Sequence, residues 1–378
     1  MQANVYDKGL KMREYYIDNI RILCILLLFP FHTCMVFNTF NEPFYVFSRP
    51  VTVLSQFNII VYPWWMALLF AIAGISSSYA LKKRSSKEYL KERVFKLLIP
   101  LLFGIILIIP VQSYIADIFH NGYSGGYFEH YIVFFTKLTD LTGYDGGFTT
   151  AHTWFVLYLF VISIIALPLM LWYNKRNKKI DGSKIKMPML LSMFLVILLM
   201  TPIIELSGKS VGEFLACFLL GFFLLSLEEV QDKLVKYRWL LGVSWVILMA
   251  IRSFMQLNNM GHGLVWDIEQ RMLTWIGILA ILGLGKTYLN FNNKFTQYFS
   301  PAAFPIYFFH QSVLVIVAFY AVRFTKLVSL QFTLILLISF IITLLCYEIL
   351  RRFSVTCFMF GIKKKSKNAN TKTFNSFK

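Results

Sequence analysis

One histidine stands inside a long apolar run near the N-terminus. The stretch 20–37 reads IRILCILLLFPFHTCMVF, and His32 follows Arg21 by eleven residues. On a helix this spacing puts both side chains on nearly the same face, about 20° apart in direction and about 16 Å apart along the axis. An arginine at the membrane surface can anchor an anion, and a deeper histidine can act as a base near neutral pH. The pair predicts proton-transfer chemistry on an anionic substrate. The alternative is that Arg21 only fixes topology and His32 only bonds a neighbouring helix.

A second histidine lies in a later apolar run. Residues 300–313 read SPAAFPIYFFHQSV. Ser300 and Pro301 resemble an N-cap followed by a first-turn proline, which predicts that a helix begins there. His310 then lies about nine residues into the helix, with Tyr307 three residues earlier on an adjoining face. The two side chains are candidates for a shared polar cavity, and helix packing is the alternative for His310.

The outer ends of other apolar runs carry further polar and aromatic candidates. His152 and Trp154 begin the stretch HTWFVLY, Glu205 lies in TPIIELSG, and Arg252 lies in MAIRSFMQ. Each could contact substrate or could be an interfacial anchor. The segment 120–152 is rich in glycine and aromatic residues, a composition that suits sugars and also suits a membrane interface.

The elements that position these residues follow from the composition. Hydrophobic residues make up 57% of the 378 residues, charged residues make up 15%, and the mean hydropathy is +0.62. These values predict an all-α, polytopic membrane protein. The expected transmembrane helices are about ten, near 20–40, 59–81, 95–118, 152–173, 188–206, 211–227, 237–256, 271–289, 302–323 and 329–350. Pro30 deprives the Leu26 carbonyl of its helical partner and predicts a kink in the first of them.

The basic residues predict the orientation. With both termini cytoplasmic, 30 of the 37 Lys and Arg residues fall on the inner side, as the positive-inside rule requires. The net charge of +18 therefore reflects topology and contact with the lipid bilayer rather than nucleic-acid binding. The inner loop from Lys82 to Lys96 is also a candidate site for an anionic cytosolic substrate.

The chain is expected to form one membrane domain over residues 1–355, followed by a basic, disordered cytoplasmic tail over 356–378. The five cysteines show neither metal-ligand spacing nor a disulfide framework. We therefore expect no metal site and no bound cofactor.

Taken in order, several motifs resemble the acyltransferase type 3 family of integral membrane proteins. They are Arg21-x10-His32, the block YPWWMALLFAIAGISSSYALKKRSSKEYLKERVFKLLIPLLFG at 62–104, HTWF at 152–155 and FPIYFFHQ at 304–311. The stretches GGYFEHYIVFF and HTWFVLYL are most similar to the branch that includes glucan-biosynthesis membrane succinyltransferases. The sequence departs from the family pattern at Ala73-Gly74, where a Ser-Gly is expected, and at Phe304-Pro305.

The resemblance implies transfer of an acyl group, acetyl or succinyl, from cytosolic acyl-CoA to a hydroxyl of a cell-surface or periplasmic carbohydrate, at a bacterial plasma membrane. It implies an essential Arg and His at Arg21 and His32, with His32 either taking the proton from the acceptor or first carrying the acyl group. His310 is a further catalytic candidate. The substrate-binding candidates are Tyr307, His152, Trp154, Glu205 and Arg252, and the acyl-CoA candidates are Arg21, Lys82, Lys83, Arg84 and Arg93. The alternative is a proton-coupled transporter or flippase of a glycan or small solute. The oligomeric state stays open.

Overall fold

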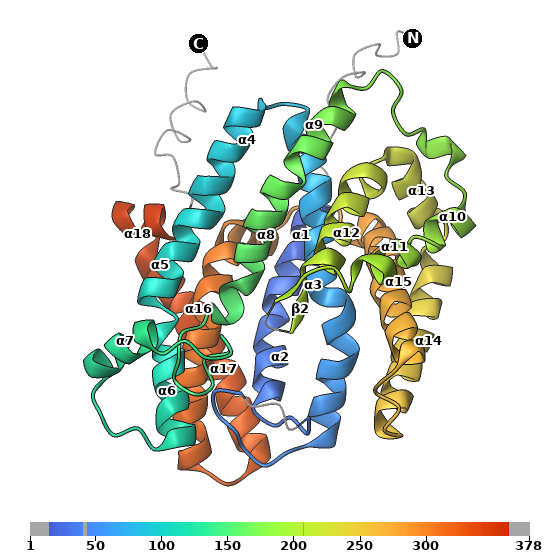
Figure 1. The fold of residues 1–378 in the computed structure, drawn as a ribbon. Coiled ribbons are helices and arrows are strands. Elements are labelled where there is room, and N and C mark those ends of the chain that lie inside the picture. Colours follow the sequence, from blue (N-terminus) through green and yellow to red (C-terminus); the bar gives the residue numbers. More distant parts are fainter. Residues whose placement is uncertain (1–14, 41–43, 207, 363–378) are drawn as a thin grey trace, which may run out of the picture.

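Helices make up nearly all of the regular structure in the computed structural model, which describes residues 15–40, 44–206 and 208–362 (Figure 1). Within this part of the chain, seven helices are long and apolar enough to cross a membrane, and up to nine if each of two bent pairs is one span. One two-stranded hairpin joins β1 and β2, with Glu205 opposite Ser210. The predicted all-α, polytopic fold is confirmed.

The elements follow one another with few long connections. In chain order they are α1 (Tyr16–Leu26), α2 (Leu28–Met35), α3 (Thr52–Leu81), α4 (Ser86–Arg93), η1 (Val94–Leu98), α5 (Ile99–Leu107), α6 (Pro110–Asn121), α7 (Tyr127–Thr136), η2 (Ala151–Thr153), α8 (Trp154–Ile165), α9 (Leu167–Lys175), η3 (Gly182–Lys184), α10 (Met187–Leu191), α11 (Phe194–Met200), β1 (Glu205–Leu206), β2 (Lys209–Ser210), α12 (Val211–Leu220), η4 (Gly221–Leu225), α13 (Glu228–Lys236), α14 (Arg238–Leu257), α15 (Leu264–Tyr288), α16 (Lys294–Phe324), α17 (Val328–Leu350) and α18 (Ser354–Met359).

Each of the ten predicted spans coincides with helix, but three of them are bent or short. The span predicted at 152–173 bends by 41° between α8 and α9. The span predicted at 188–206 is a short apolar pair, α10 and α11, that ends at Met200. The span predicted at 211–227 bends by 96° into α13. Hydropathy measures how apolar a window of residues is, but it does not detect a bend or an end of the helix within that window.

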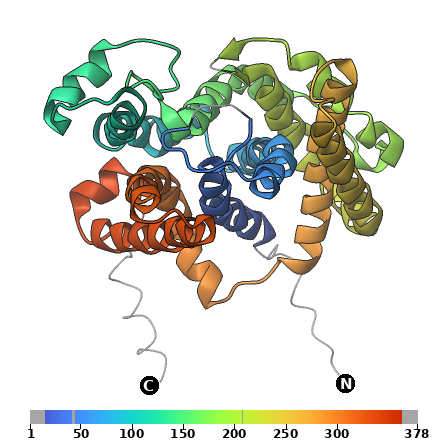
Figure 2. The same ribbon diagram turned by 90° about the horizontal axis from the view of Figure 1, so that it is seen from below.

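The first span is interrupted where its proline predicts. Pro30 has no N–H to give the Leu26 carbonyl, and the regular helix breaks at Leu27 between α1 and α2. Leu27 still bonds back to Leu23 at 2.9 Å, and Phe31 bonds to Leu27 at 3.1 Å. The interruption is local, so α1 and α2 run on as one span, which packs with α3 at the centre of the bundle (Figure 2).

Helix α16 begins earlier than predicted. The sequence analysis placed the N-cap at Ser300, whereas the helix starts at Lys294. The Asn293 side chain accepts a bond from the Thr296 N–H at 3.0 Å, and Thr296 Oγ1 accepts one from the Asn293 N–H at 3.0 Å. This capping box satisfies two of the free N–H groups of the first turn. Pro301 is therefore carried inside the helix.

Helices α3 and α12 cross at close range through two glycines. A Cβ atom on Gly74 would overlap the carbonyl oxygen of Phe218, and one on Gly221 would overlap that of Ala71. Small residues allow helices in membranes to approach backbone to backbone. The glycine of the Ala73-Gly74 pair is therefore required by packing.

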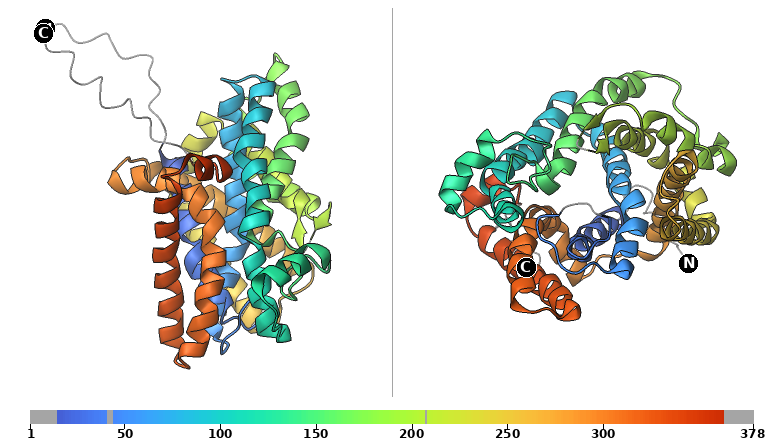
Figure 3. Two further views of the ribbon diagram at one scale, coloured as in Figure 1. Left: turned by 90° about the vertical axis from the view of Figure 1, so that its left-hand side faces the viewer. Right: turned by 60° about the horizontal axis from the view of Figure 1, so that its bottom comes forward.

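The two ends of the described chain lie toward the same end of the bundle, the end from which α4 and α9 project (Figure 3). The last helix, α18, packs against α5, and Cys357, Phe360 and Ile362 are buried. Residues 356–362 of the predicted tail are therefore part of the fold, because these apolar side chains have a surface to pack on. Residues 363–378 of the predicted tail lie outside the described residues.

The glycine crossing gives a prediction on stability. We expect Gly74→Ala to cost about 1–3 kcal/mol or more, because backbone atoms of α12 cannot move aside as a side chain can. Gly242→Ala is the matched control, since a Cβ there meets only Leu284 at 3.6 Å. Thermal unfolding of the purified protein measures both. Equal unfolding temperatures for the two variants would contradict the close crossing.

Candidate functional site

Three histidines from distant parts of the chain meet in the bundle. His32 comes from α2, His310 from α16 and His152 from η2. The ring centroids of His32 and His310 are 5.1 Å apart, and those of His152 and His310 are 5.0 Å apart. His310 is fully buried between the other two. The structure therefore brings together three of the residues that the sequence singled out, on elements separated by more than a hundred residues.

Backbone carbonyls fix which nitrogen of each ring carries hydrogen, because a carbonyl oxygen can only accept a bond. His32 donates from Nδ1 to the Leu28 carbonyl at 3.0 Å, and His310 donates from Nδ1 to the Tyr307 carbonyl at 2.7 Å. His310 Nε2, left as an acceptor, lies 3.4 Å from His32 Nδ1. His32 Nε2 is then the unprotonated nitrogen, and it has no hydrogen-bond partner among the described residues.

His152 is held between α16 and α6. It donates from Nε2 to the Phe308 carbonyl at 2.9 Å, and its own carbonyl accepts the Tyr307 hydroxyl at 2.5 Å. Gln112 Nε2 donates to His152 Nδ1 at 3.2 Å and to Ser312 Oγ at 2.6 Å. Both ring nitrogens of His152 are thus in use, which makes this residue a positioning group.

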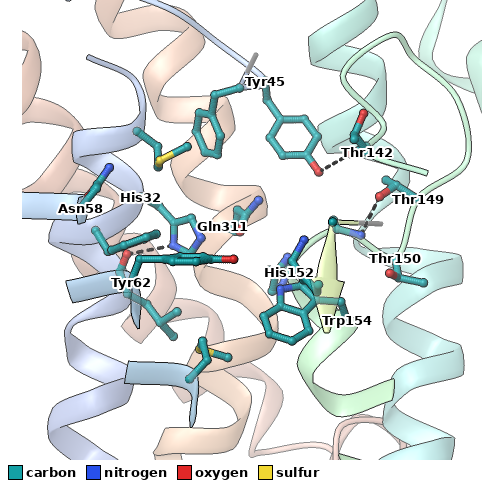
Figure 4. Close-up of a pocket in the computed structure, with 18 of the residues that line it drawn as sticks. His32, Tyr45, Asn58, Tyr62, Thr142, Thr149, Thr150, His152, Trp154 and Gln311 are labelled. Carbon is teal, nitrogen blue, oxygen red and sulfur yellow. Dashed lines mark hydrogen bonds between the residues drawn. The ribbon is translucent and has the colours of Figure 1, made fainter. Parts of the chain in front are cut away.

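A cavity of about 550 Å³ lies beside the histidines (Figure 4). His32, His152 and Tyr307 line it, whereas His310 lies behind them. Its other walls come from α2 and α3, the loop after α2, the segment 141–151, the hairpin and the end of α14. Aromatic side chains dominate these walls. Figure 4 shows His32, Asn58 and Tyr62 on one side of the cavity, and Trp154 and Thr150 across from them.

Arg252 and Trp154 line this cavity, but Glu205 does not. Arg252 is buried, bonded to Glu269 at 3.1 Å and to Gln270 at 3.0 Å. Glu205 is exposed on β1, opposite Ser210. Leu206 and Lys209 of the same hairpin line the cavity instead.

The predicted acyl-CoA residues lie near the C-terminal end of α3, whereas the cavity is lined by the N-terminal half of this helix. Arg21 bonds to Asp18 at 2.8 Å and to Ser76 Oγ at 3.3 Å, and Arg93 bonds to Ser77 Oγ at 2.9 Å. Arg21 and Arg93 thus each bond to one of two successive serines near the same end of α3.

The basic residues between α3 and α4 are more dispersed. Arg84 is ion-paired with Glu92. Lys82 lies over the Tyr79 ring at 5.4 Å, and Lys83 is exposed.

The first half of the segment 120–152 serves packing. His130 is buried with Nε2 3.1 Å from Asp117 Oδ2, among the rings of Tyr114 and Tyr123. Burial lowers the pKa of His130, and the Asp117 carboxylate opposes that shift. The second half, from Leu141, lines the cavity.

The sequence analysis did not single out several polar residues of this region. They are Asn58, Gln112, Gln311 and Ser312. Each lies within an apolar helix, and that is the signal that could have found them, since polar side chains are costly in lipid. The candidates chosen from the sequence were charged residues, histidines, Tyr307 and Trp154.

The chain was compared with known proteins. A family model for an acyltransferase domain, that of the acyltransferase type 3 proteins, matches residues 14–348. Glucans biosynthesis protein C of Salmonella typhimurium is 24% identical, over 96% of this chain and 98% of the relative. The proteins of the same name from Salmonella heidelberg and Salmonella typhi are also 24% identical, over 94% of this chain and 98% of each relative. No solved structure matches this chain.

The buried Arg252–Glu269 pair gives a prediction. We expect Arg252→Met to cost about 3–5 kcal/mol, because it leaves the Glu269 carboxylate buried without its partner. The double variant Arg252→Met/Glu269→Gln removes both charges and should recover most of the loss. Unfolding of the purified proteins measures this. A double variant no more stable than Arg252→Met would contradict the pairing.

Proposed function

Because the chain belongs to the acyltransferase type 3 family of membrane-integral enzymes, we propose that it moves an acyl group from acyl-CoA to a hydroxyl of a carbohydrate, with His32 as general base. The acyl group is acetyl or succinyl. The name of the similar Salmonella proteins, glucans biosynthesis protein C, supports a glucan as the acceptor. The multi-pass helical bundle supports a reaction carried out within the membrane.

One observation carries the role of His32. Its Nδ1–H is held by the Leu28 carbonyl, and its unprotonated Nε2 has no partner among the described residues, while the side chain lines the cavity. A general base needs this arrangement, with one nitrogen fixed as a donor and the other free to accept a proton.

The reaction then proceeds by proton transfer and addition. His32 Nε2 takes the proton from a hydroxyl of the carbohydrate, while the oxygen of that hydroxyl attacks the thioester carbonyl of acyl-CoA. The tetrahedral intermediate collapses by breaking the carbon–sulfur bond. The leaving thiolate takes the proton back from His32, so ester and free CoA are formed and the histidine returns to its neutral state.

His310 supports the charged form of His32. Its Nε2 lone pair faces His32 Nδ1 at 3.4 Å and can accept the hydrogen that becomes more acidic when His32 is protonated. His152 does not face His32 in this way, because both its nitrogens are bonded elsewhere. We therefore assign both as positioning residues. His310 positions the base His32, and His152 positions α16.

Donor and acceptor approach from opposite ends of the first span. Arg21 and Arg93 supply cationic groups for the phosphates of acyl-CoA at the end of α3 that precedes α4. The pantetheine arm follows the α1–α2 face toward His32, over the rise of about 16 Å that eleven helical residues give. The acceptor enters the aromatic cavity on the other side of His32, where ring faces suit the C–H faces of sugars. The transporter alternative has no comparable support, because the family match is to an acyltransferase.

The role of His32 is tested by substitution. We expect His32→Ala to lower transfer by about 10²–10⁴-fold, as loss of a general base does, without changing expression. His262→Ala is the control, because His262 is an exposed histidine outside the cavity. Transfer is measured with labelled acyl-CoA and a glucan. Incubation with labelled acyl-CoA and no acceptor should leave the chain unlabelled, and a label on His32 would show that it carries the acyl group instead.

The donor site is tested by removing its charges. Arg21→Ala and Arg93→Ala should each raise the KM for acyl-CoA by about 10-fold or more, since a charged hydrogen bond contributes roughly 1.5–3 kcal/mol. Arg176→Ala is the control, because Arg176 is exposed at the end of α9 and stacks on Trp172. An unchanged KM for acyl-CoA in both site variants would place the donor elsewhere.

A further inference from the structure

The side chain of Asn58 on α3 is buried without a hydrogen-bond partner. Only 2% of the residue is exposed, and neither Oδ1 nor Nδ2 bonds to any described residue. Gln311 on α16 is 4% exposed, and its Oε1 is also unpartnered. Native proteins leave few buried polar atoms unsatisfied, because each costs free energy of desolvation. Both residues line the cavity next to His32 (Figure 4).

Other polar side chains near Asn58 on the same helix are satisfied within the protein. Ser55 Oγ donates to the Val51 carbonyl at 3.2 Å and accepts the Thr39 N–H at 2.9 Å. Gln56 Oε1 accepts a bond from Ser253 at 2.7 Å. The fold therefore provides partners for this stretch of α3, and Asn58 differs because its amide is unpartnered at the wall of the cavity.

The chemistry of the cavity wall indicates which kind of ligand would supply hydrogen-bond partners for these amide atoms. A carboxamide offers two N–H donors and a carbonyl acceptor, so it can bind two neighbouring hydroxyls at once. No Asp or Glu is among the described residues that line the cavity. Of the two cations there, Arg252 is paired with Glu269, and Lys209 lies over the Trp154 ring at 5.3 Å. Tyr62, one turn after Asn58, and Trp65 add aromatic surface. This combination of free amides, rings and no free carboxylate suits an uncharged polyhydroxy compound.

We propose that Asn58, together with Gln311 Oε1, forms a hydroxyl-binding subsite for the carbohydrate acceptor. The subsite holds neighbouring hydroxyls of one sugar ring so that another hydroxyl of the same ring faces His32 Nε2. This rests on the proposed function and deepens it, because it names the residues that decide which hydroxyl receives the acyl group.

The experiment uses the full chain, labelled acyl-CoA and glucose disaccharides of different linkage. The best accepted disaccharide is then compared with its monodeoxy derivatives, for wild type and for Asn58→Leu. We expect Asn58→Leu to raise the KM for the disaccharide by about 10-fold or more, as when two hydrogen bonds are lost, and to leave the KM for acyl-CoA unchanged. Wild type should lose affinity for particular deoxy derivatives, and the variant should no longer distinguish them from the parent sugar.

Two controls separate binding from structure. Gln56→Leu makes the same kind of change two residues away, outside the cavity, and should keep the acceptor KM and the deoxy preferences of wild type. Asn58→Leu should unfold at a temperature no lower than wild type, because it removes an unpartnered buried amide. An unchanged acceptor KM, or unchanged deoxy preferences, in an active Asn58→Leu would overturn the subsite alone. Wild-type enzyme that acylates none of the disaccharides would instead overturn the proposed acceptor class.

Discussion

Two reciprocal hydrogen bonds join η2 to α16, and the arrangement of the site depends on them. The Tyr307 hydroxyl donates to the His152 carbonyl, and the His152 imidazole donates to the Phe308 carbonyl. Neither group can turn to water in the interior of a membrane bundle, so breaking either bond would leave polar atoms unpaired at high cost. The bonds fix α16 against the start of α8, and this sets where His310 meets His32. They also hold the end of the segment 141–151 at the wall of the cavity.

The polar residues of the bundle divide into two groups. One group is bonded to other side chains of the protein, as in the Gln112–His152–Ser312 network and the buried pairs of Arg252 with Glu269 and Arg271 with Glu213. The other group belongs to residues that line the cavity and have polar atoms without a partner among the described residues, and it includes His32 Nε2, the Asn58 amide and Gln311 Oε1. Groups of the second kind cost stability in the empty protein, and a bound substrate can repay that cost. The first group stabilises the fold, and the second group is available to a ligand. Arg252 lines the cavity but belongs to the first group, because it is ion-paired with Glu269.

The first span connects two chemically different ends of the molecule. At one end, Arg21 and Arg93 lie on adjacent serines of α3. At the other, the cavity is lined mainly by aromatic rings and uncharged polar groups, together with Lys209 and the ion-paired Arg252. The span stays nearly continuous across the interruption at Leu27, so the helical spacing between Arg21 and His32 is preserved. This separation is consistent with the proposed reaction, in which an anionic donor and a carbohydrate acceptor reach His32 from different sides.

The sequence by itself determined the helical spans, the placement of Arg21 and His32 on one helix, and the interruption caused by Pro30. These features depend on neighbouring residues, on bilayer thickness and on the period of the helix. The start of α16 was mispredicted because the capping box at Asn293 lies in a polar stretch that hydropathy assigns to a loop. Only the tertiary structure decided that His310 meets His32 across 278 residues, that Glu205 faces outward, and that Asn58 lacks a partner. Whether a buried polar group is paired depends on side chains from helices distant in the sequence, and no local pattern contains that information.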